Sequence, residues 1–167
     1  MYTDYIIEDA SLDCLERIVE IYNSTIASRM VTADIEPVSV DSKRQWFEDH
    51  TSDHFPIWVM KKEGDVVAWF SFQPFSDRPA YDATAEISVY IAQEYRSQGI
   101  GSILLQRAIQ VAPSLNLSNL VAYVYAHNEA SLALLKKFQF EQWGYYPKVT
   151  KMDGVEMDVV ALGRRVV

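Results

Sequence analysis

The spacing of apolar residues alternates along the chain between the period of a helix and the period of a strand. A first helix is predicted between Ser11, a suitable N-cap, and about Thr25. Its apolar face consists of Leu12, Leu15, Ile18, Val19 and Tyr22. A second, short helix is expected to begin at Ser39, with Trp46 and Phe47 on its buried side.

Two more helices are predicted in the second half of the chain. One covers residues 100–112 and ends at Pro113, which cannot continue a helix. The other extends from its N-cap Asn128 to about Phe138. Strand periodicity occupies residues 5–8, 57–61, 66–73, 85–91, 120–125, 141–146 and 156–162. Helices thus alternate with strands of a mixed sheet, which predicts an α/β or α+β fold.

Composition restricts the number of domains and the class of partner. A chain of 167 residues with 49% hydrophobic residues and no linker-like segment is expected to form one domain over residues 1–167. Its 23 acidic residues outnumber 15 basic ones, giving a net charge of −8, so nucleic acid is not expected as a partner. A small anionic ligand remains compatible with this charge, because backbone N–H groups at a helix N-terminus can hold a phosphate.

The chain is expected to be cytoplasmic, with no membrane partner. Its first residues lack an apolar run of signal-peptide length, and no stretch reaches the roughly 20 apolar residues that cross a bilayer. With only three histidines and no carboxylate motif around them, no metal site is predicted.

The most distinctive motif lies between the strand at 85–91 and the helix at 100–112. It is formed by Arg96, Ser97, Gln98, Gly99, Ile100 and Gly101. Two glycines and the free N–H groups of a helix start suit a pyrophosphate, although an ordinary helix cap would also account for them. No Gly-Lys-Ser/Thr follows, which excludes a Walker loop, and Leu104 stands where a Rossmann fingerprint needs a third Gly or Ala.

In this setting the motif resembles the acetyl-CoA-binding R/Q-x-x-G-x-G/A segment of the GCN5-related N-acetyltransferases, the GNAT family. The resemblance covers nearly the whole chain and includes the strand 86–91 and the helix after Asn128. Four further runs are similar to phosphinothricin N-acetyltransferases: residues 21–23, 79–81, 88–90 and 163–165. The resemblance implies a mixed, mostly antiparallel sheet of six to seven strands with splayed middle strands, flanked by about four helices.

The same resemblance implies where acetyl-CoA, the expected co-substrate, would bind. The backbone of Val89, Tyr90 and Ile91 would hold the pantetheine and the acetyl carbonyl like an added strand. Residues 96–101 would surround the pyrophosphate. Asn128 would reach the pantetheine arm, and Ser131 on the same helix is assigned to the same site. For Asn128, a simple N-cap is the alternative role, and the two roles are compatible.

The resemblance also assigns chemical roles. Glu86 matches the acidic residue expected as general base, which would need a pKa raised by burial; a solvated Glu at a strand end is the alternative. A backbone N–H near Tyr90 is expected to stabilise the acetyl oxygen. Two positions depart from the family pattern. Leu135 stands where many relatives place a tyrosine acid, and Gln139 stands where glycine is usual before Phe140.

An amino-acid acceptor would need a cation for its carboxylate, and Arg78 and Lys148 are the candidates from the sequence. Phe75 and Tyr81 are candidate walls of the acceptor pocket; all four could instead be ordinary surface residues. The predicted function is acetyl transfer to phosphinothricin, methionine sulfoximine or a similar small amine. Another amine acceptor (a polyamine, an aminoglycoside or a protein N-terminus) and a non-catalytic acyl-CoA-binding module are the alternatives. A homodimer is expected, with the aromatic residues of segment 143–146 suited to its interface.

Overall fold

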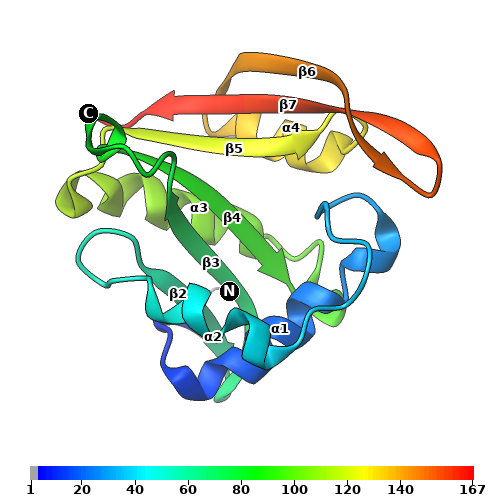
Figure 1. The fold of residues 1–167 in the computed structure, drawn as a ribbon. Helices are drawn as coiled ribbons and strands as arrows, with labels where there is room; N and C mark the ends of the chain where they lie inside the picture. Colours follow the sequence, from blue (N-terminus) through cyan, green and yellow to red (C-terminus); the bar gives the residue numbers. More distant parts are fainter. Residues whose placement is uncertain (1–3) are drawn as a thin grey trace.

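The computed structural model describes residues 4–167, which form a seven-stranded sheet in the order β1-β2-β3-β4-β5-β7-β6 (Figure 1). Neighbouring strands are antiparallel except β4 and β5, which are parallel. The strands are β1 (Tyr5–Asp9), β2 (Ile57–Lys62), β3 (Asp65–Pro74), β4 (Thr84–Ile91), β5 (Asn119–Tyr125), β6 (Glu141–Met152) and β7 (Val155–Arg165). The α-helices are α1 (Leu15–Asn23), α2 (Val40–Glu48), α3 (Ile100–Val111) and α4 (Glu129–Lys137). The predicted mixed sheet with splayed middle strands and four helices is confirmed.

The middle of the sheet is open on one side. β4 pairs with β5 only through Thr84–Glu86 and Asn119–Val121, and the two strands then separate, as Figure 1 shows. From residue 87 onward β4 therefore has a neighbour on its β3 side alone. The sheet consists of two halves, β1–β4 and β5–β7, that meet at three residue pairs.

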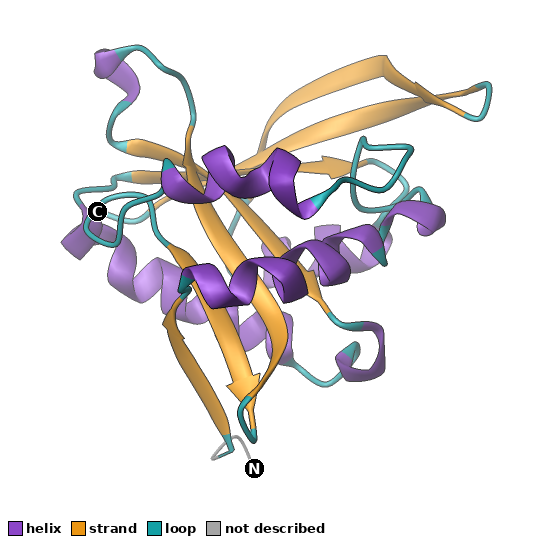
Figure 2. Cartoon of the chain, turned by 60° about the horizontal axis from the view of Figure 1, so that its bottom comes forward, coloured by secondary structure: helices purple, strands orange, loops and turns teal. Residues whose placement is uncertain are grey.

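Helices cover both faces of the sheet (Figure 2). On one face, Phe70 and Phe72 of β3 pack in a large cluster with Leu104 and other residues of α3. On the other face, Trp69 packs with Ile18 of α1 in a smaller cluster. This alternation along β3 follows from the two-residue period of a strand. Each fully buried apolar side chain of this size stabilises the fold by about 1.5–3 kcal/mol.

Most predicted elements are confirmed, with shifts at their ends. Ser39 and Asn128 accept hydrogen bonds from the backbone N–H groups of Ser42 and Ser131, as N-caps do. The first helix was predicted too long: a 3₁₀ turn at Leu12–Cys14 precedes α1, and Leu12, expected on the buried face, is exposed. Ser11 caps through its backbone carbonyl, which accepts from the N–H of Cys14.

The remaining differences concern α2 and β6. Trp46 and Phe47 are half-buried rather than buried, because α2 covers the edge of the smaller cluster. β6 continues beyond the predicted end at Tyr146 as far as Met152. The aromatic side chains of Trp143, Tyr145 and Tyr146 are exposed on this strand. Within residues 4–167, no helix is long and apolar enough to cross a membrane.

Candidate active site

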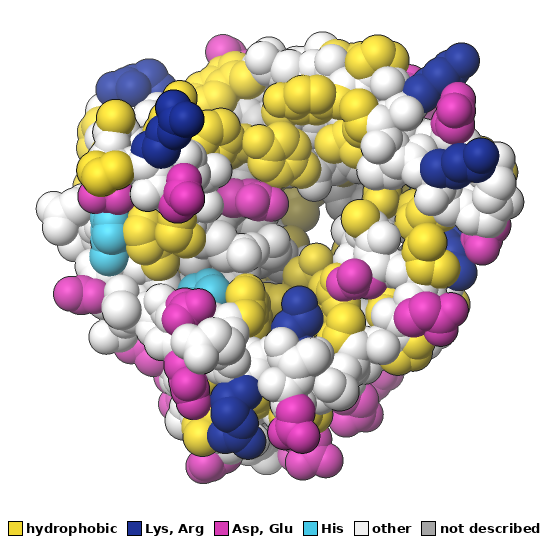
Figure 3. All heavy atoms as spheres, viewed as in Figure 1, with side chains coloured by type: hydrophobic (Ala, Val, Ile, Leu, Met, Phe, Trp, Pro, Cys, Tyr) yellow, Lys and Arg dark blue, Asp and Glu magenta, His cyan; other side chains and the backbone are white. Residues whose placement is uncertain are grey.

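A cavity of about 440 Å³ lies where β4 and β5 separate. A space-filling view shows a hollow in the centre of this face of the molecule (Figure 3). The cavity is lined from both halves of the sheet and from both of its faces, by residues of α1, α2, β3, β4, β5, α3 and α4. Helices from both faces of the sheet therefore contribute to one cavity.

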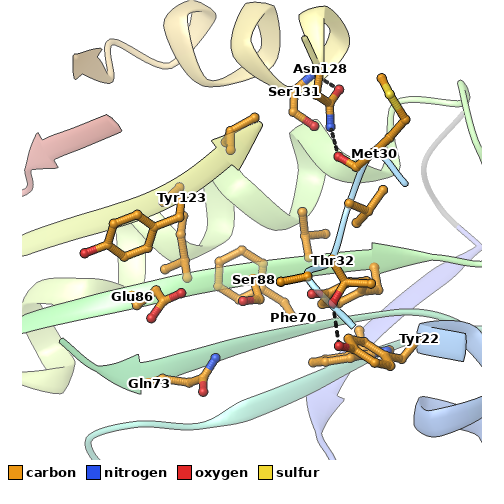
Figure 4. Close-up of a pocket in the computed structure, with 18 of the residues that line it drawn as sticks. Tyr22, Met30, Thr32, Phe70, Gln73, Glu86, Ser88, Tyr123, Asn128 and Ser131 are labelled. Atoms are coloured by element: carbon orange, nitrogen blue, oxygen red, sulfur yellow. Dashed lines mark hydrogen bonds between the residues drawn. The ribbon is translucent and has the colours of Figure 1, made fainter. Parts of the chain in front are cut away.

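Glu86 lies on β4 at the last residue pair that joins the two halves of the sheet. Its side chain lines the cavity beside Gln73 of β3, and Tyr123 of β5 lies above it (Figure 4). Burial raises the pKa of the Glu86 carboxyl above its ordinary value. Burial is the one cause of this shift, with no hydrogen bond from the described residues, so the carboxyl is available to a ligand in the cavity.

An aromatic cluster supports the opposite end of the cavity. The ring of Tyr90 stacks on Trp69 at 4.6 Å between centroids and meets the edge of Tyr22 at 5.1 Å. The Tyr22 hydroxyl hydrogen-bonds to Asp34 and to Thr32, and burial followed by the bond to Asp34 raises the pKa of Tyr22 to about 12. Burial also raises the pKa of Tyr90. Both phenols therefore stay protonated at neutral pH.

The predicted phosphate loop lies at the N-terminus of α3. Gly99 is the N-cap with φ of +82°, a left-handed conformation that glycine adopts without strain. The first N–H groups of α3 have no partner within the helix and remain available to an anion. Gly101 lines the cavity, and a Cβ there would lie 3.1 Å from Leu134 of α4, so its lack of a side chain permits close packing.

The polar side chains of Arg96 and Gln98 bind residues before the loop, in β4, at the end of α1 and in the turn that precedes the loop. Arg96 donates from Nε to the carbonyl of Ile91 at 3.1 Å and from Nη2 to Ser24 at 3.4 Å. Gln98 donates to the carbonyl of Glu94 at 3.1 Å. Ser97 is exposed with φ of +61°, and Ile100 is buried in the core. Arg96 and Gln98 thus hold the loop in place, and residues 96–99 are exposed.

The predicted cofactor residues of β4 and α4 line the same cavity. Val89 and Tyr90 do so on β4, and Asn128 and Ser131 at the start of α4. Ile91 follows Tyr90 on the same strand, and its side chain lies 3.8 Å from the position that a Cβ of Gly101 would take. The structure therefore brings Glu86 and the α4 residues together around one space.

Residues 24–39, the strap, connect α1 to α2 and join the two halves of the sheet. Asn128 donates from Nδ2 to the carbonyl of Met30 at 3.1 Å, as Figure 4 shows. Arg29 forms an ion pair of 2.8 Å with Asp153 in the turn between β6 and β7. The buried Tyr125 hydroxyl donates to the carbonyl of Thr32. The strap thus closes one side of the cavity.

The four residues predicted to bind the acceptor are not among the described residues that line this cavity. Phe75 and Tyr81 contact each other at 5.5 Å between centroids, and Arg78 lies beside them; all three are exposed. Lys148 is exposed on β6, where its backbone N–H donates to Asp158. Sequence reasoning missed Lys43 of α2, which does line the cavity. The apolar pattern of α2 gave no indication of the site that this helix faces.

The two departures from the family pattern have visible consequences. Leu135 is buried against the cavity and cannot donate a proton, while Tyr123, half-exposed, has a pKa raised mainly by burial. Gln139 adopts φ of +65°, the left-handed conformation for which glycine is usual. The backbone N–H of Gln139 donates to the carbonyl of Lys136, and the N–H of Phe140 donates to the carbonyl of Leu135. These two hydrogen bonds form a Schellman motif. The turn geometry is therefore retained without glycine.

Comparison with known proteins identifies the family. The acetyltransferase (GNAT) family model matches residues 16–140, which include β4, the phosphate loop and α4. The chain belongs to the GNAT acetyltransferase family. It is accordingly an acetyltransferase, and the splayed sheet is the part of the GNAT fold that contains the cavity.

Three GNAT relatives illustrate the range of similarity. A Bacillus subtilis protein named "Putative phosphinothricin acetyltransferase YwnH" is 49% identical over 90% of this chain and 92% of its own length. The L-methionine sulfoximine/L-methionine sulfone acetyltransferase of Pseudomonas aeruginosa is 29% identical over 92% of this chain and 90% of its own. The crystal structure of a Sinorhizobium meliloti phosphinothricin acetyltransferase in complex with acetyl-CoA has a TM-score of 0.90, at 26% identity over 97% and 88% of the two chains.

Proposed function

We propose that this chain transfers the acetyl group of acetyl-CoA to the amino group of a small amino-acid-like acceptor such as phosphinothricin or methionine sulfoximine. The observation that carries the proposal is the half-buried carboxyl of Glu86, which lines the cavity at the point where β4 and β5 separate. The names of the relatives support this class of acceptor.

Acetyl-CoA would bind in the opening between the two strands. Beyond Glu86 the β5-facing edge of β4 lacks a strand partner, so its backbone can bind the amides of the pantetheine as a neighbouring strand would. The exposed N–H groups at the start of α3 would hold the pyrophosphate. Arg96 supports this arrangement by holding the carbonyl of Ile91, which fixes the loop relative to β4.

Glu86 would act as the general base. It removes a proton from the acceptor ammonium, directly or through one water, and the neutral amine attacks the carbonyl carbon of the thioester. A backbone N–H near Tyr90 stabilises the negative charge on the acetyl oxygen. The C–N bond forms, the attacking nitrogen releases its second proton to solvent, the C–S bond breaks and CoA leaves as a thiolate. A thiol with a pKa near 8.5 leaves without an obligatory acid, which is consistent with Leu135 at the usual tyrosine position.

Replacement of Glu86 tests the mechanism. Glu86→Gln keeps the shape of the side chain and removes the base, so kcat should fall by at least about 100-fold while the affinity for CoA stays within about twofold. The assay measures release of CoA thiol with phosphinothricin, methionine sulfoximine, a polyamine and an aminoglycoside. Glu141→Gln, an exposed carboxylate of β6, is the matched control and should not change the rate.

The pH dependence of the rate is a second test of Glu86 as the general base. Because burial raises the pKa of Glu86, the acidic limb of kcat/KM should lie above the range of an ordinary glutamate and should disappear in Glu86→Gln. An unchanged rate in the variant would remove Glu86 from the mechanism. Transfer only to the polyamine or the aminoglycoside would retain the activity and reject the amino-acid acceptor.

A further inference from the structure

An amino-acid acceptor introduces an electrostatic problem into this cavity, and the inference drawn from it rests on the proposed function. The α-carboxylate of such an acceptor is two bonds from the nitrogen that must approach Glu86. Two carboxylates in a partly dry space repel each other unless a cation binds the second one. A decarboxylated amine of the same shape would need no such cation.

The described part of the cavity wall contains one basic side chain, Lys43 of α2, and one acidic side chain, Glu86 of β4. Lys43 is half-buried, and no described carboxylate lies within ion-pair distance of its ammonium group. Its Nζ lies 5.8 Å from the centre of the Tyr22 ring, a cation–π contact. Its charge is therefore not neutralised by an ion pair within residues 4–167.

The surroundings of Lys43 fix its place in the cavity. Tyr22, on which it rests, is held by hydrogen bonds to Thr32 and Asp34 of the strap and by its contact with Tyr90. Trp46, one turn further along α2, contacts Trp69 at 5.5 Å between centroids. The contacts of Lys43 with Tyr22 and of Trp46 with Trp69 attach α2 to one face of the sheet. Glu86, Ser88 and Tyr90, every second residue of β4, lie on this same face.

We propose that the ammonium group of Lys43 binds the α-carboxylate of the acceptor and makes the enzyme selective for amino acids over simple amines. The acceptor then lies between these two side chains, with its carboxylate on Lys43 and its nitrogen facing Glu86 through one water, because the carboxylate and the nitrogen are only two bonds apart. Each charge of the zwitterion meets the opposite charge of the protein, which orients the nitrogen toward the acetyl group. Arg78 and Lys148, the cations expected from the sequence, do not line this space.

The test compares two acceptors that differ only in the carboxylate: methionine sulfone and 3-(methylsulfonyl)propylamine. Lys43→Met should lower kcat/KM for methionine sulfone by at least about tenfold, through KM, and change the value for the amine by less than about twofold. Lys43→Arg should restore most of the loss. Arg44→Met, the exposed neighbour on the same helix, is the matched control and should change neither value.

The outcomes separate this inference from the proposed function. An equal loss for both acceptors in Lys43→Met, or a carboxylate-selective loss in Arg78→Met instead, would overturn the role of Lys43 and leave the proposed function intact. Transfer by the unmodified enzyme to the amine but not to methionine sulfone would overturn the role of Lys43 within an intact acetyltransferase. Absence of transfer to any amine would overturn the proposed function and this inference together.

Discussion

At the scale of single residues, the burial that suits Glu86 to act as a base also opposes folding. Burial removes water from the charged carboxyl and so destabilises it, and the pKa of Glu86 is therefore higher in the folded protein than its ordinary value of 4.5. Well below pH 4.5 the group is protonated in both folded and unfolded chains and the desolvation penalty is absent. The penalty develops as pH rises from 4.5 through the folded-state pKa and is complete above it.

Glu86→Gln should therefore raise the melting temperature at pH 8, because an amide carries no charge to desolvate. The gain should shrink as pH falls and vanish well below pH 4.5, where Glu86 is neutral in both states. Calorimetry of both proteins across this range measures the difference. Glu141→Gln, exposed on β6, should show no comparable gain at pH 8, and a pH-independent gain in Glu86→Gln would contradict the argument.

The position of a residue was predictable where a family motif fixed it in the fold. Glu86 was assigned from the family resemblance, and its side chain does line the cavity at the point where β4 and β5 separate. The positions of Lys43 and Arg78 relative to the cavity were not predictable from the sequence. Their places depend on how α2 docks and on how the loop after β3 folds, and neither follows from local spacing.

At the scale of elements, the contact between the strap and α4 is held by one amide. Asn128 accepts from the N–H of Ser131 with Oδ1 and donates with Nδ2 to the carbonyl of Met30, so it caps a helix and anchors the strap at once. The two functions can be separated, because aspartate retains the cap but lacks the donor.

Asn128→Ala should lower the free energy of unfolding by about 1–2 kcal/mol through loss of the cap and of the strap contact. Asn128→Asp should recover the cap and still increase amide exchange in residues 29–35. Urea unfolding and hydrogen exchange measure the two effects. Equal protection of the strap in Asn128→Asp and in the unmodified protein would show that Arg29, Tyr22 and Tyr125 suffice to hold it.

Element boundaries were less predictable than element types. The predicted β6 ends at Tyr146, yet the strand continues through Pro147, because β6 is an edge strand, where a residue without an N–H group is tolerated. Its pairing with β7 is irregular between Tyr146 and Thr150, and resumes afterwards. The turn at Gln139 was also not predictable from local sequence, because it lacks the usual glycine. The Schellman hydrogen bonds, and the hydrogen bond from Arg164 to the Phe138 carbonyl, support this turn instead.

At the scale of the whole molecule, a ligand that enters between β4 and β5 should strengthen the connection between the two halves of the sheet. CoA at about 100 times its dissociation constant should raise the free energy of unfolding by about 2.7 kcal/mol. Hydrogen exchange should slow both at the start of α3 and in the β5 residues Tyr123–Tyr125.

Adenosine 3′,5′-bisphosphate, which lacks the pantetheine arm, is the matched control for this measurement. It should protect the start of α3 and leave residues 123–125 unchanged. Protection of β5 by the nucleotide alone would contradict the proposed path of the pantetheine between the strands.

The order of the strands also has a consequence for the synthesis of the chain. Strands β1 to β4 pair in the order in which they leave the ribosome, each antiparallel to the one before it, and α1 and α2 pack on the same half. This part can assemble while the later strands are still being translated, because its pairs are formed by neighbouring segments. The seam with β5, and the cavity along it, forms only when the residues from Asn119 onward emerge. The nascent protein thus becomes able to bind its substrates only after β5 and α4 have been translated.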